Sequence, residues 1–290
     1  MMKSIVIFCS ICIFPFVGYS GNNSGLFNEA DSLAVANKFE WAALEYERIC
    51  YTTFDNRIRT LALNAKAECQ LKIYDPHAAK KSMLRVSYFG LSDSLVSASR
   101  QRTAYASYLD KDFKQASSQL FLIDQFLSED YQAESALLYA LALNELKEWS
   151  KAKEKMIFWA SQNIDDQSTR DSLLFEIECA YDDKNYPKYR DPERASLWSS
   201  IIPGAGQLYS GYFWDAVFSV AMLSTGLGAA AVGIFVIKYY VAGIVLGYGL
   251  FQRFYMAGIK RAEYLAGKRN YLNETKYNSQ LKRLILSTEP

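Results

Sequence analysis

Between Leu26 and Tyr181 the sequence almost lacks glycine, since Gly90 is the only one in that stretch. The same region has no alternation of apolar and polar residues, so it does not predict β-strands. Apolar residues recur instead every three or four positions, which is typical of amphipathic α-helices. We therefore predict an all-α chain with helices near residues 26–37, 40–53, 57–72, 76–87, 93–109, 112–126, 131–146, 149–161 and 167–182.

Residues that usually carry chemistry are also scarce. The single histidine, His77, follows Asp75 and Pro76, a helix-capping residue and a proline at the first helical position, so we expect it to be structural. We find no cluster of metal ligands, no phosphate-binding loop and no nucleophile elbow. No long basic array indicates nucleic acid. We predict that the protein is not an enzyme and has no catalytic residues, metal or cofactor.

Charge is nearly absent from Ser196 to Ile259. This stretch of 64 residues holds ten of the fifteen glycines. An apolar run of about 18 residues or more can cross the roughly 30 Å hydrocarbon core of a bilayer as a helix. We predict two transmembrane helices, at about 213–236 and 239–257. The only charged residues of the stretch are Asp215, Lys238 and Arg253.

The first twenty residues resemble a signal peptide. A positive start at Lys3 precedes an apolar segment from Ile5 to Gly18, which is short for a membrane span. Small residues at Gly18 and Ser20 fit cleavage after Ser20. The alternative is an uncleaved amino-terminal anchor.

Cleavage would leave three cysteines. Each lies in a predicted helix, where a buried cysteine behaves as a small apolar residue. In an exported protein Cys50 and Cys69 could instead form a disulfide, leaving Cys179 unpaired.

The predicted helices repeat in pairs. An aromatic residue begins every second helix, and alanine follows three or four residues later, where it would let two helices approach closely. The pairs are Phe39/Ala42, Tyr74/Ala78, Phe113/Ala116 and Trp149/Ala152, with aromatic residues 35, 39 and 36 positions apart. A period in the mid-thirties built from helix pairs is typical of a helical solenoid.

At these positions the chain resembles the tetratricopeptide repeat (TPR) family, with segments such as Lys111-Asp112-Phe113-Lys114-Gln115-Ala116. The glycine of that family before the turn and its proline at the repeat end are missing. The resemblance implies a TPR-like solenoid over residues 26–182 that binds proteins or peptides. The alternative is an irregular α-helical bundle.

A second motif opens the apolar stretch. It resembles a hairpin module of uncharacterised bacterial envelope proteins and, more faintly, the two-helix TM2 domain, which implies membrane attachment but no chemistry. Its aromatic residues would anchor at the membrane surface, and its glycines would allow a tight break before the first span. The residues that carry it are Pro203, Gly204, Gly206, Gln207, Tyr209, Gly211 and Asp215.

Polar residues in this module need an explanation. Asp215 and Arg253 could pair inside the hairpin or contact lipid or a partner. They could equally lie at the membrane interface, where they would only cap or orient helices. Gln207 leaves the same alternatives open.

These features divide the chain into a signal peptide (1–20), TPR-like repeats with a linker (21–190), a membrane hairpin (191–259) and a basic amphipathic tail (260–290). The tail holds seven Lys and Arg against three Glu, so it would lie on an anionic membrane surface or fold back on the repeats.

The signal peptide would place the repeats on the periplasmic side of the bacterial inner membrane. The positive residues that flank the hairpin favour the cytoplasm instead. Since long domains cross membranes largely regardless of charge, we expect the periplasm.

The sequence thus predicts a scaffold anchored in the lipid bilayer, with a protein or peptide partner bound by the repeats. Alternatively, the hairpin oligomerises in a transport or protein-insertion complex, and the repeats regulate it.

Overall fold

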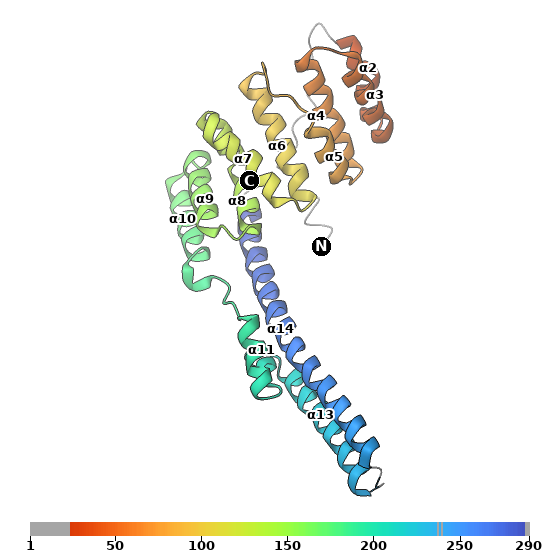
Figure 1. The fold of residues 1–290 in the computed structure, drawn as a ribbon. Helices are drawn as coiled ribbons and strands as arrows, with labels where there is room; N and C mark the ends of the chain where they lie inside the picture. The colour runs from red at the N-terminus through yellow and green to blue at the C-terminus, as the bar shows by residue number, and fades with distance from the viewer. Residues whose placement is uncertain (1–23, 237, 239, 288–290) are drawn as a thin grey trace. The chain divides into compact units, whose positions relative to one another are not determined.

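The computed structural model describes residues 24–236, 238 and 240–287, and the predicted signal peptide lies outside this range. The described residues contain helices and no strand, so the all-α prediction is confirmed. Contacts divide the chain into two compact units (Figure 1). The first comprises residues 24–183 together with 281–287, and the second comprises residues 184–280.

The first unit consists of helices that pack in chain order, each against the next (Figure 1). Additional contacts join α4 to α6 and α6 to α8, the first helices of successive pairs. The helices are α2 (Ser24–Val35), α3 (Phe39–Thr52), α4 (Asn56–Lys72), α5 (Pro76–Met83), α6 (Asp93–Leu109), α7 (Phe113–Phe126), α8 (Glu129–Glu145), α9 (Trp149–Asn163) and α10 (Gln167–Ala180).

The predicted helix boundaries agree with these to within two residues, with one exception. The predicted helix 76–87 ends at Met83, four residues earlier. The helix predicted to begin after Asp130 begins at Glu129, with Ser128 at its N-cap.

The turn inside each pair has the same backbone geometry. In the third pair the amide of Lys111 donates to the carbonyl of Tyr108, and the amide of Asp112 donates to the carbonyl of Ser107. This is the Schellman arrangement, which places the residue after the helix in the left-handed region. The left-handed residues are Asn37, Tyr74, Lys111 and Lys147, with φ of 58°, 62°, 63° and 66°. None of them is glycine, so residues with side chains adopt the left-handed conformation at all four turns.

These turns correct the predicted register of the second pair. Tyr74 is the left-handed turn residue and is 78% exposed, so it does not fill a groove between helices. Pro76 takes the place that Phe39 has in the first pair, and fully buried Ala79 replaces Ala78. The other three predicted alanines, Ala42, Ala116 and Ala152, are all fully buried.

No disulfide joins the buried residues Cys50 and Cys69. Burial raises the pKa of the Cys50 thiol to about 11 and that of Cys69 to about 12. Both therefore behave as small core residues, as the first interpretation of the sequence predicts. For Cys179 that interpretation is wrong, because this residue is exposed.

The second unit contains the apolar stretch. Its elements are the 3₁₀ helix η1, of which Lys184 and Asn185 belong to this unit, α11 (Pro192–Ile201), α12 (Ala205–Tyr209), α13 (Phe213–Ala231), the π-helical segment η2 (Val232–Val236) and the part of α14 (Tyr240–Ser287) up to residue 280.

The helix α14 runs without a break from the predicted second span, which ends at 257, into the predicted tail, which starts at 260. Ala262 and Ala266 of α14 are fully buried and pack with Ala195 of α11. These contacts explain why the helix does not break after the apolar segment.

Candidate binding groove and membrane module

A groove of about 470 Å³ crosses the first helices of four successive pairs in the first unit. Its walls are partly apolar and partly charged. The lining includes Phe27 and Asp31 of α2, Tyr46 of α3, Arg57, Leu61, Asn64 and Glu68 of α4, Leu95, Ser97 and Arg102 of α6, and Tyr131 and Glu134 of α8.

The floor of the groove is held by a polar network between α4 and α6. Arg102 Nη1 donates to Asn64 Oδ1 at 3.0 Å, and Asn64 Nδ2 donates to Ser99 Oγ at 2.7 Å. The second guanidinium nitrogen lies 3.4 Å from Glu68 Oε2. Asn64 and Ser99 are buried, so breaking the hydrogen bond between them would leave polar groups without a partner. This bond therefore fixes the distance between α4 and α6.

A second fixed polar group lies at the α2 side of the groove. The Tyr46 hydroxyl donates to Asp31 Oδ1 at 2.6 Å. Burial is the main reason that the pKa of Tyr46 lies well above its usual range, and the hydrogen bond to Asp31 and the charge of Asp31 raise it further. Tyr46 therefore remains a neutral donor at any physiological pH.

The sequence offers Tyr46, Tyr105, Tyr108 and Tyr139 either as candidates for a binding face or, for most of them, as core residues. All four are buried, and among them Tyr46 is the one that lines the groove. The structure instead exposes charged residues that the helical pattern does not single out, such as Arg57. A signal for the polar floor exists in the sequence, because α6 carries serine and threonine where an ordinary core helix would be apolar.

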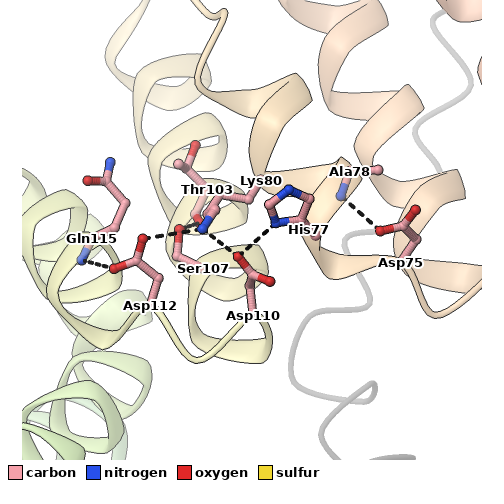
Figure 2. Close-up of polar contacts among 9 residues, drawn as sticks. All are labelled: Asp75, His77, Ala78, Lys80, Thr103, Ser107, Asp110, Asp112 and Gln115. Atoms are coloured by element: carbon pink, nitrogen blue, oxygen red, sulfur yellow. Dashed lines mark hydrogen bonds and ion pairs between the residues drawn. The ribbon is translucent and has the colours of Figure 1, made fainter.

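His77 belongs to a polar joint between α5 and the α6–α7 turn (Figure 2). Its Nδ1 lies 3.3 Å from Asp110 Oδ2, and Lys80 pairs with both Asp110 and Asp112. The hydrogen bond from Lys80 holds the pKa of the Asp110 carboxyl below its usual range. Asp112 also caps α7 by accepting from the amide of Gln115. These contacts link two successive helix pairs, which is a structural role.

The Pro203–Gly211 motif forms the packing centre of the second unit. Gly204 has a φ of 93°, which glycine adopts without strain, and begins the short helix α12. Gly206 lies so close to α11 that a Cβ atom there would be 1.9 Å from the carbonyl oxygen of Ala195. Gly211 has a φ of 84° and ends α12 with the same turn as the repeats. The three glycines therefore let α11, α12 and α13 meet.

Gln207 is fully buried at this centre and uses both ends of its amide. Its Oε1 accepts from Ser199 of α11 at 2.8 Å. Its Nε2 donates to the hydroxyl of Ser219 and to the carbonyl of Gly258, each at 2.9 Å. Gln207 thus connects three other helices, which assigns it a structural role.

Tyr209 and Asp215 secure the edges of the motif. The Tyr209 hydroxyl accepts from the amide of Asp191 at 3.3 Å, and the guanidinium of Arg190 lies 5.1 Å from the centre of its ring. Asp215 pairs with Arg261, whose Nε lies 2.7 Å from Asp215 Oδ1. The suggested pair between Asp215 and Arg253 is therefore wrong, because the partner of Asp215 is Arg261. Arg261 lies about two helical turns beyond Arg253 along α14.

Within the described residues, the segment from Phe213 to Val236 is the one helix long and apolar enough to cross a membrane. The predicted second span corresponds to the start of α14, where Gln252 and Arg253 reduce the apolar character. The two helices pack closely, since a Cβ atom on Gly247 would lie 2.2 Å from that of Ala230.

No protein-family model, curated protein or solved structure matches this chain. Nor does any group of three His, Cys, Asp or Glu residues suited to a metal ion occur in the part of the chain that the structure describes.

Proposed function

We propose that this protein is a membrane-anchored, TPR-like scaffold that binds an extended segment of another protein along its repeats. The observation that carries the proposal is the groove across four successive helix pairs. A surface built from repeated elements can contact a chain over several residues, which is how solenoids recognise partners.

The groove's composition suits a polypeptide. Phe27, Leu61 and Leu95 supply apolar wall surface, while Arg57 and Glu134 carry opposite charges on the same lining. Such a surface offers apolar contact and partners for both signs of charge, as protein interfaces do. We propose no enzymatic role.

The anchor in this proposal is the hairpin of α13 and the start of α14, inserted in the bacterial inner membrane, with the first unit in the periplasm after cleavage of the signal peptide. The apolar length of Phe213–Val236 supports membrane insertion. Gly226 and Gly247 pack α13 against α14, whereas Gly228 and Gly249 have no heavy atom within 4 Å of their Cβ positions, so an oligomerising hairpin is the alternative proposal.

Site-specific photo-crosslinking in the producing cells tests the groove. A photoreactive residue at Ala98, in the groove lining, should yield a discrete protein adduct. The same residue at exposed Lys114 on α7 should not. Arg57→Glu, at an exposed position of the groove lining, should abolish the adduct at Ala98 while the chain remains folded. Equal adducts at both positions, or an adduct insensitive to Arg57→Glu, would contradict the proposal.

The side of the membrane is tested separately, by adding protease to intact spheroplasts. Digestion of the first unit from outside supports the periplasmic placement. Protection, reversed by detergent, would move the scaffold and its partner to the cytoplasm.

A further inference from the structure

The last helical residues of the chain are docked on the first unit. Residues 281–287 form the end of α14 and group by their contacts with that unit. Leu281 is 1% exposed and Ile285 is fully buried. Residues four apart share one face of a helix, so this short segment presents an apolar face that is covered.

A cationic contact accompanies the apolar one. The ammonium of Lys282 lies 5.4 Å from the centre of the Tyr108 ring, within the range of a cation–π interaction. Tyr108 stands near the end of α6, is buried, and packs edge-on against Phe113 at 5.4 Å between ring centres. The docking surface therefore includes a rigid aromatic group at the α6–α7 turn.

This arrangement has the features by which a protein surface recognises a separate helical peptide. Such recognition uses apolar anchors at i and i+4 on an amphipathic helix, with charged groups beside them. The opposite side of the segment is solvent-facing, since Arg283 and Ser287 are exposed. The segment thus leaves the side of Arg283 and Ser287 open to solvent, while Leu284 and Leu286 are partly buried.

We propose that residues 281–287 are an internal ligand of the first unit, and that the surface around Tyr108 binds a helix of this chemistry when the tail is absent. The ligand class is an amphipathic helix with two aliphatic residues four positions apart and a lysine beside the first. The inference does not require a ligand in the groove described above, so the two proposals can fail independently.

The test uses a fluorescein-labelled synthetic peptide of residues 276–290 and the purified protein in detergent. Fluorescence anisotropy compares the full-length chain with a chain that ends at Gln280. A tethered segment competes at an effective concentration of about 1 mM. The peptide should therefore bind the shortened chain at least tenfold more tightly than the full-length chain.

Two variant peptides serve as controls. The peptide with Leu281→Asp and Ile285→Asp should not bind, because both anchors are buried in the folded chain. The peptide with Arg283→Gln should bind like the parent, because that side chain is exposed. Equal loss in both peptides would point to general charge attraction and would overturn the proposal.

Other outcomes also decide the matter. If the shortened chain keeps its helical content and binds no peptide, the segment is a fixed part of the fold and the proposal is wrong. If the shortened chain does not fold, full-length protein with Leu281→Asp and Ile285→Asp replaces it, and the same tenfold gain is required. Failure of both chains to fold would show that the surface cannot exist without the tail, which also overturns the proposal.

Discussion

The side-chain amide of Gln207 donates a hydrogen bond of 2.9 Å to the carbonyl oxygen of Gly258, 51 residues further along the chain. The same nitrogen donates to Ser219, and the amide oxygen accepts from Ser199. A fully buried side chain with all these bonds is costly to replace, because its partners would lose their own hydrogen bonds.

Gln207→Ala should therefore lower the stability of the second unit by about 3 kcal/mol, since it leaves several buried polar groups unpaired. The measurement is the apparent melting temperature of the purified protein in detergent. Gln252→Ala is the matched control, because Gln252 is exposed in the same unit. Similar melting temperatures for the two variants would show that the hydrogen bonds of Gln207 do not stabilise the second unit.

Gly206→Ala should disrupt the contact between α11 and α12. The new methyl group would lie 1.9 Å from the Ala195 carbonyl oxygen, so the helices must separate, at a cost of about 3 kcal/mol. Gly267→Ala in α14 has open space around its Cβ position and should instead stabilise the chain by about 0.5–1 kcal/mol. Denaturant unfolding of both variants tests the pair, and a tolerated alanine at 206 would refute the close approach.

Asp215 should couple energetically to Arg261 and not to Arg253. The pair is partly exposed, with 54% of the Arg261 side chain accessible, so a double-mutant cycle with Asp215→Asn and Arg261→Gln should give about 0.5–1 kcal/mol. The parallel cycle with Arg253→Gln should give no coupling. A larger coupling to Arg253 would restore the pairing that the sequence suggests.

Glu47 should make the first unit sensitive to acid. Lys66 and Arg85 both contact its carboxylate at 2.7 Å. Burial raises the pKa of Glu47, but hydrogen bonds from these two residues outweigh it and hold the pKa below its usual range. An unfolded glutamate has a pKa of about 4.3. Between this value and the lower pKa of native Glu47, the unfolded chain binds more protons than the folded chain, so the free energy of unfolding falls as the pH decreases.

Glu47→Gln should accordingly lower the free energy of unfolding by about 1–2 kcal/mol at pH 7. This loss should become smaller as the pH falls below about 4.3 toward the lower pKa of the native carboxylate. Urea unfolding monitored at several pH values measures this difference. Glu40→Gln, at an exposed position of the same helix, should show no such dependence. A constant difference for Glu47→Gln across the range would mean that the ion pairs contribute nothing.

The helices of the first unit could be predicted from the sequence because their signals are local. Apolar spacing marks each helix, and Asp75 before Pro76 marks the start of α5. Buried alanines at 42, 116 and 152 follow from the repeat period. The register at Tyr74 could not be predicted in this way, because an aromatic residue in the left-handed turn position looks the same as one that begins a helix.

The sites depend on contacts between distant segments. The lining of the groove comes from helices spread over more than a hundred residues, and its floor rests on a bond between Asn64 and Arg102. Both are polar residues, and in the sequence each looks like a residue on the solvated face of its helix. Nothing in their spacing shows that α4 and α6 lie side by side.

The sequence by itself determined the all-α class, the order of the helices and the apolar segment from Phe213 to Val236, because each depends on residues within a few turns of one another. Tertiary structure alone decided that Arg261 pairs with Asp215, that Gln207 reaches Gly258, and that Leu281 and Ile285 are buried on the first unit. These contacts arise from the packing of helices separated along the chain, and local periodicity carries no information about which faces meet.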